Sequence, residues 1–174
     1  DVADEQEVEA MFGFVASELG GLDALINNAG IAGPTGGVDE ISPQDWRRCI
    51  DVCLTGQFLC TRLAVPMLKA AGGGSIVNMS SAAGRHGYAF RTPYSSAKFG
   101  IIGFTQSLAK ELGPSGIRVN AILPGWIKSD MTAGIMANDK FVANVMPRIP
   151  SRRFGEPSDF GGIAVYLMSK ASSY

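Results

Sequence analysis

The chain has 174 residues, of which 46% are hydrophobic and 18% are charged. This length suits a single domain, and the apolar fraction argues against a disordered chain. The 15 basic and 16 acidic residues nearly cancel and form no basic run, so nothing indicates binding to nucleic acid. No apolar stretch reaches the roughly 18 residues typical of a transmembrane helix. We therefore expect a soluble protein with no membrane partner.

The first part of the chain has the apolar periodicity of helices around a short strand. Asp4 is expected to cap a helix with a stripe of one apolar residue per turn, which ends before Gly20-Gly21. A strand is predicted over residues 22–26. Ser42-Pro43 predicts the start of a long helix to about residue 70, with a kink at Pro66. The apolar face of this helix is predicted to contain Trp46, Ile50, Cys53, Phe58 and Val65.

The remainder of the chain continues the alternation of strands and helices. We predict strands over 75–79 and 118–123, helices from Thr92-Pro93 and from Pro157, and an irregular, Met-rich segment over 126–150. This order indicates an α/β fold, a doubly wound parallel sheet in three layers, with residues 1–174 in one Rossmann-like domain. In such sheets ligands bind beyond the carboxyl ends of the strands.

The cysteines and the single histidine point to no separate chemistry. The chain has three cysteines, an odd number, at the helical spacing of Cys49, Cys53 and Cys60. We therefore expect buried, reduced thiols and neither a disulfide framework nor a metal site. His86 follows Ser81 by five residues, but no Gly-x-Ser-x-Gly elbow is present. A serine hydrolase is therefore not favoured, and His86 is expected in a loop or pocket.

Tyr94 and Lys98 carry the chemistry that the sequence suggests. They are four residues apart at the start of a helix, so their side chains share one face. Tyrosine is a poor base near neutral pH because its usual pKa is about 10, and a nearby ammonium favours the phenolate. The spacing alone is weak evidence. However, Ser81 ends a strand 13 residues earlier, and other polar or permissive strand ends are Asn27-Asn28-Ala29-Gly30 and Pro124-Gly125.

These motifs, in this order and spacing, resemble the classical short-chain dehydrogenase/reductase family, and the resemblance extends over the whole chain. The family includes β-ketoacyl carrier-protein reductases and sugar-acid and steroid dehydrogenases. The resemblance implies an oxidoreductase that transfers a hydride between NAD or NADP and an alcohol or carbonyl substrate. It implies Tyr94 as general acid/base, Lys98 as the cation that lowers the Tyr94 pKa, and Ser81 as the group that holds the substrate oxygen. The implied cofactor contacts are Tyr94 and Lys98 together with Asp1, Val2, Asn27, Ala29, Gly30, Pro124, Gly125, Ile127 and Ser129.

The sequence departs from the family pattern in two ways. Cys53 stands where the family has an asparagine whose backbone carbonyl holds a water in a proton relay, which puts the relay in doubt. The glycine-rich turn after the family's first strand is absent, as is the residue that selects NAD or NADP. A final strand is also absent. We therefore expect the sequence to be a fragment or the ordered part of a longer protein. We also expect the 174 residues, when expressed alone, to fold poorly.

Several interpretations stay open at this point. A non-catalytic relative that binds a dinucleotide or serves assembly is the alternative function. Arg85, Arg91 and Arg148 suit an anionic substrate or a solvated surface, and Trp126, Met131, Met136 and Met146 suit a lid or ordinary packing. We expect a cytoplasmic homo-oligomer, with a tetramer favoured, because Phe58, Val65, Ile101, Phe104 and Leu108 supply more apolar surface than one sheet face needs.

Overall fold

The computed structural model describes all residues, 1–174, and is built on a three-stranded parallel sheet. The strands β1 (Ala24–Asn27), β2 (Gly74–Met79) and β3 (Ile117–Ile122) lie in the order β1-β2-β3. In this register Leu25 pairs with Ile76, which pairs in turn with Val119. The predicted α/β fold with a doubly wound parallel sheet is confirmed, and each strand lies within two residues of its predicted bounds.

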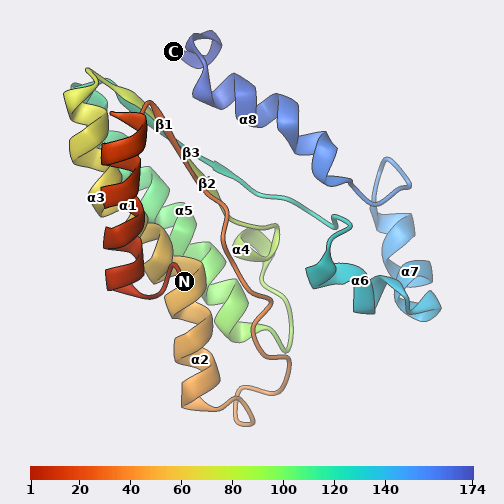
Figure 1. Ribbon diagram of the computed structural model, residues 1–174. Coiled ribbons are helices and arrows are strands. Elements are labelled where there is room, and N and C mark those ends of the chain that lie inside the picture. The colour runs from red at the N-terminus through yellow and green to blue at the C-terminus, as the bar shows by residue number, and fades with distance from the viewer.

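Helices cover both faces of the sheet (Figure 1). On one face lie α1 (Glu5–Leu19), α3 (Gly56–Ala70) and α5 (Thr92–Leu112), whereas α8 (Gly161–Met168) packs against β2 from the other side. The remaining helices are α2 (Pro43–Ile50), α4 (Ala83–His86), α6 (Asp130–Met136) and α7 (Asp139–Val145). No helix combines the length and the low polarity that crossing a membrane requires.

Local signals place the helix ends where the sequence predicts them. The Asp4 carboxylate accepts from the backbone N–H groups of Gln6 and Glu7 and so caps α1, and Ser42 caps α2 through Asp45 N–H. Gly20 follows α1 in the left-handed conformation, at φ 71°. The expected caps are confirmed because they depend on neighbours in the chain alone.

The long helix predicted from residue 43 differs from expectation in two respects. A π-helical turn over Asp51–Thr55 separates α2 from α3, while α3 runs through Pro66 to Ala70. The interruption of the helical hydrogen bonds therefore lies earlier than predicted. Trp46 and Phe58 are 39% and 48% exposed, so the predicted apolar face is wrong at these positions. For Phe58, which follows the π turn, the extra residue of that turn changes the direction of the side chain relative to a regular 3.6-residue period. Trp46 lies before the turn and is not explained by it.

The main core lies between the sheet and the α1, α3 and α5 helices. It contains the following residues: Val8, Phe12, Leu59, Cys60, Ala64, Leu68, Ile76, Leu108, Leu112, Ile117 and Val119. Buried amides cross the same region, because Asn27 Nδ2 donates to Thr61 Oγ1 (3.0 Å) and Asn78 Oδ1 (2.9 Å), and Asn78 Nδ2 donates to Thr105 Oγ1 (2.9 Å). These bonds tie β1 and β2 to α3 and α5.

Two residues assigned to an oligomer surface belong to the core of the chain itself. Ile101 is 0% exposed and Leu108 is 9% exposed, whereas Phe58 remains half exposed. The assignment of Ile101 and Leu108 to a surface is therefore wrong. Both lie on the side of α5 that meets the sheet, and the sequence alone does not reveal which side that is.

Candidate active site

Parallel strand ends bring Ser81, Tyr94 and Lys98 together at one edge of the sheet. Ser81 lies two residues beyond β2, and Tyr94 and Lys98 lie on the first turns of α5. Backbone bonds from Ser80 N–H to Ile122 O (2.9 Å) and from Ala82 N–H to Pro124 O (2.9 Å) extend the β2–β3 pairing past the strands. The Ser81 segment is therefore fixed beside Pro124-Gly125.

A close backbone approach fixes α4 against α5. An added Cβ on Gly84 would lie 2.5 Å from Lys98 O and 2.7 Å from Ser80 Oγ, so only glycine fits there. Ser80 Oγ also donates to Lys98 O at 2.7 Å. Ser80 and Gly84, on either side of Ser81, thus set the position of Ser81 relative to the Tyr94 helix. Gly84 was not singled out from the sequence, because its neighbour is 14 residues away in the chain.

The Lys98 ammonium is buried and points at the end of β2. Its side chain is 4% exposed, and Nζ donates to Met79 O at 2.7 Å and lies 5.6 Å from the centre of the Tyr94 ring. Burial lowers the pKa of Lys98, and the nearby Cys53 and Cys49 sulfurs oppose this shift. An ammonium has three donors, so two remain for hydroxyl groups of a ligand.

Tyr94 is largely buried, with its ring between two cations. Arg91 Cζ lies 5.3 Å from the ring centre, and Lys98 Nζ lies at a similar distance. Burial raises the pKa of the Tyr94 phenol, while the hydrogen bond with Ser81 and the Arg91 charge act in the opposite direction. The Ser81 hydroxyl is therefore placed to share a single ligand oxygen with Tyr94.

Cys53 lies beneath the site without lining the cavity. Its Sγ lies 3.4 Å from both the N and the O of Ile31, and the residue is 0% exposed. Its hydrogen bond with Cys49 lowers the pKa of Cys53 and raises that of Cys49. All three cysteines are buried and free, as predicted. Cys53 thus holds the chain that leads from Gly30 to Ile31.

A cavity of about 650 Å³ opens in front of these side chains. It is lined by the catalytic candidate Ser81 and by most of the predicted cofactor contacts, namely Ala29, Gly30, Tyr94, Lys98, Pro124, Gly125, Ile127 and Ser129. It is also lined by residues that the sequence analysis did not identify, among them Asn28, Lys128, Asp130, Thr132 and Phe160. Its size is typical of cofactor sites, which measure about 300–1,000 Å³.

The other predicted contacts lie apart from this cavity. Val2, Asn27 and Ala29 line a smaller cavity of about 170 Å³ with Gln57, and Asn27 also belongs to the buried amide network. Asp1 is exposed and pairs with Arg48 at 2.9 Å. The structure therefore divides the predicted contacts other than Asp1 between two cavities, with Ala29 in both.

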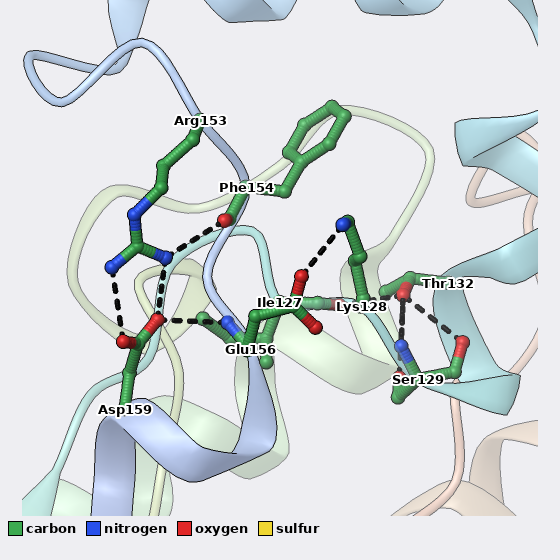
Figure 2. A network of polar contacts seen from close by, with 8 residues as sticks. All are labelled: Ile127, Lys128, Ser129, Thr132, Arg153, Phe154, Glu156 and Asp159. Atoms are coloured by element: carbon green, nitrogen blue, oxygen red, sulfur yellow. Dashed lines mark hydrogen bonds and ion pairs between the residues drawn. The ribbon is translucent and has the colours of Figure 1, made fainter.

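The wall after Pro124-Gly125 is held by polar contacts with a segment near residue 155 (Figure 2). Lys128 N–H donates to Gly155 O and Gly155 N–H donates to Trp126 O, both at 2.9 Å. Exposed ion pairs join Lys128 to Glu156 and Arg153 to Asp159, each at 2.6 Å. These long-range contacts leave no local pattern, which explains why Lys128 was missed.

The fold and the site define a three-layer α/β protein with serine, tyrosine and lysine at the carboxyl edge of a parallel sheet. Residues 1–174 match the family model described as Enoyl-(Acyl carrier protein) reductase. The chain is 41% identical over its whole length to trans-4-hydroxycyclohexanecarboxylate dehydrogenase of Sinomonas cyclohexanicum, and spans 64% of that protein. The chain belongs to the short-chain dehydrogenase/reductase family.

Solved structures support the same assignment. A structure described as a gluconate dehydrogenase from Agrobacterium tumefaciens matches 100% of this chain and 68% of its own, with a TM-score of 0.96 and 37% identity. A gluconate 5-dehydrogenase from Burkholderia cenocepacia, in complex with NADP and tartrate, matches 99% of this chain and 68% of its own, with a TM-score of 0.95 and 27% identity. The chain thus spans about two thirds of the relatives it matches.

Proposed function

We propose that the protein is an NAD(P)-dependent oxidoreductase that interconverts an alcohol and a carbonyl compound. The observation that carries this proposal is the convergence of Ser81, Tyr94 and Lys98 on one cavity of about 650 Å³. Family membership and the dehydrogenase names of the relatives support it. The intact trio argues against a non-catalytic relative.

The cavity suits a nicotinamide dinucleotide. Gly30 and Gly125 line the cavity with backbone and no side chain. Lys98 has donors left for ribose hydroxyls, and Ile127 and Ser129 line the same cavity and would contact the carboxamide and the phosphates. The bound nicotinamide would supply or accept the hydride.

The proton then moves through the side chains of this chain. Ser81 donates a hydrogen bond to the substrate oxygen and holds it next to the Tyr94 hydroxyl. Tyr94 gives its proton to that oxygen in reduction and removes it in oxidation. The buried Lys98 stabilises the phenolate through its charge, at 5.6 Å from the ring centre.

The substitution Tyr94→Phe tests this assignment. We expect kcat to fall about 10²–10⁴-fold because the general acid/base is removed. Binding of NADH or NADPH, followed by fluorescence, is expected to stay within a few-fold. Tyr166→Phe is the matched control, since Tyr166 is half exposed on α8 and outside the site. Near-normal turnover of Tyr94→Phe would exclude the proposed role.

The assembly and setting of the protein form part of the same proposal. We propose a single Rossmann-like domain in a cytoplasmic homo-oligomer, with a tetramer favoured. The half-exposed Phe58 and Phe99 on α3 and α5 support association, and the three free thiols support a reducing compartment. Light scattering at micromolar concentration is expected to give a multiple of the monomer mass, and a monomer would refute this part.

A further inference from the structure

A second cavity adjoins the catalytic side chains. It measures about 250 Å³ and shares Ser81 and Tyr94 with the larger cavity, and its other walls include Thr35, Arg91, Trp126 and Ile135. Since the cofactor contacts gather in the larger cavity, this one is the space left for the substrate. Its volume suits a small molecule.

Arg91 is the only charged residue that lines this substrate cavity. Its guanidinium is half buried over the Tyr94 ring and donates from Nη2 to Ala32 O. No carboxylate of the chain lies within ion-pair distance, and Arg91 Nε is buried without a hydrogen-bond partner. A guanidinium has five N–H donors, and a buried cation is costly unless it is paired. The chain itself therefore leaves the Arg91 cation unpaired.

The backbone holds Arg91 in this position. Gly36 N–H donates to Phe90 O at 3.0 Å, and Ser95 N–H donates to Arg91 O at 2.9 Å. Phe90 has a φ of 63°, which is rare for a bulky residue and persists only where surrounding contacts maintain it. Arg91 is thus built into the start of α5, in contrast to the exposed Arg85.

Much of the remaining lining of the cavity is apolar or aromatic. The rings of Tyr88 and Trp126 stack at 5.9 Å with an interplanar angle of 1°, and Phe141 meets Trp126 edge-on at 4.8 Å. Ile135 and Met131 add apolar surface to the same cavity. This wall suits a hydrocarbon ring or chain, with an anionic group at the Arg91 end.

We propose that Arg91 selects a small hydroxy or oxo carboxylic acid by pairing with its carboxylate. The Arg91 guanidinium donates charge-assisted hydrogen bonds to the carboxylate, while Ser81 and Tyr94 hold the oxygen of the hydroxyl or oxo group that reacts. The aromatic wall covers the carbon body between these two ends. This inference rests on the proposed function and names the substrate class of the same site.

The test compares an acid with its neutral ester. The full-length protein is assayed for reduction of 4-oxocyclohexanecarboxylate and of its methyl ester with NADH or NADPH, and kcat/KM is measured for each compound. We expect the acid to be preferred, and Arg91→Gln to lower the acid-to-ester ratio about 10–100-fold, mainly through KM. Arg91→Lys keeps the charge without the planar fork, and an intermediate ratio is expected. Arg85→Gln removes the same charge from the neighbouring α4, and its ratio should match the wild type.

A second measurement on the wild-type protein does not depend on the folding of the variants. Cyclohexanecarboxylate is expected to inhibit, or to bind by calorimetry, at a concentration at least about 10-fold below that of cyclohexanecarboxamide. Equal effects of acid and amide, an unchanged ratio in Arg91→Gln, or a preference for acetoacetyl-coenzyme A over the acid would overturn the proposal. Retained turnover in Tyr94→Phe contradicts the proposed function instead, so the two failures are distinguishable.

Discussion

Residues 1–124 and residues 125–174 hold their parts of the site in different ways. In the first region the core cluster of 11 residues and the bonds of Asn27 and Asn78 lie in the interior. In the second region most residues are exposed, and Val145, Phe154 and Ser172 are its only buried residues. Ser81, Tyr94 and Lys98 therefore stand on a packed frame. The far wall of both cavities depends on short helices and surface ion pairs (Figures 1 and 2).

This difference separates the Ser81, Tyr94 and Lys98 side chains from the far wall of the two cavities. Proton transfer requires atoms placed to fractions of an ångström, which a packed interior provides. A substrate or cofactor wall tolerates, and often needs, lower local stability so that it can open and close. Two glycines, one in each region, allow the comparison to be tested with the same substitution.

The largest effect is expected from Gly84→Ala in the packed region. The new Cβ would meet backbone atoms of Lys98 at 2.5–2.6 Å, and backbone cannot move aside cheaply. We expect a loss of about 1–3 kcal/mol in the free energy of unfolding. A shift of Ser81 relative to Tyr94 should also lower kcat more than about 10-fold. Thermal melting and turnover measure the two effects.

Gly13→Ala serves as the control for Gly84→Ala. Gly13 lies in α1, is exposed and has no atom within 4 Å of an added Cβ. Alanine in a helix interior is favoured over glycine by about 0.5–1 kcal/mol, so a slight rise in Tm is expected. If both substitutions gave the same Tm and kcat, the frame around Ser81 would not be rigid.

A smaller effect is expected from Gly155→Ala in the exposed region. The new Cβ would lie 2.4 Å from Ile127 Cδ1, which is the end of a flexible side chain and can rotate away. Stability should change little, but Ile127 lines the larger cavity, so NAD(P)H affinity should fall several-fold. Gly161→Ala, with nothing within 4 Å, is the control. If Gly155→Ala lowered the stability of the fold strongly and left the NAD(P)H affinity unchanged, the exposed region would behave like the packed one and the comparison would fail.

The smallest effect is expected from Asp159→Asn. The Arg153 hydrogen bond, followed by that of Glu156 N–H, lowers the pKa of Asp159 from 3.8 to about 2. A depressed carboxyl pKa stabilises the fold above pH 3.8, and this contribution disappears as the pH falls through about 2. Because the pair is exposed, the difference in Tm at pH 7 should stay below about 2 °C.

The pH profile is the sharper readout for Asp159→Asn. The difference in Tm from the wild type should be constant above about pH 4 and should narrow toward pH 2. Asp39→Asn removes the same charge from an exposed residue that forms no ion pair. The difference in Tm between this variant and the wild type should not narrow toward about pH 2. A difference that grows in acid would show that Asp159 does not stabilise the segment through Arg153.

Apart from α4, α6 and α7, which were not predicted, the sequence by itself determined the alternation of strands and helices, the helix caps at Asp4 and Ser42, and the four-residue spacing of Tyr94 and Lys98. These features depend on apolar periodicity, on side chains that bond their own backbone, or on fixed spacing within one helix. Apolar periodicity in the sequence also predicted the bounds of the three strands to within two residues. The parallel α/β class then followed from their alternation with helices.

Tertiary structure alone decided which helix faces are buried, where Arg91 lies and how the far wall is held. The π turn at Asp51–Thr55 rotates Phe58 outward, although its apolar side chain predicts an inward position. The sequence favoured a solvated surface for Arg91, whereas the fold places its guanidinium over the Tyr94 ring and outside ion-pair distance of every carboxylate. Gly84 and Gly155 matter because of atoms 14 and 28 residues away, Lys98 and Ile127. Contacts across such separations arise when packing closes the chain on itself, so no local pattern encodes them.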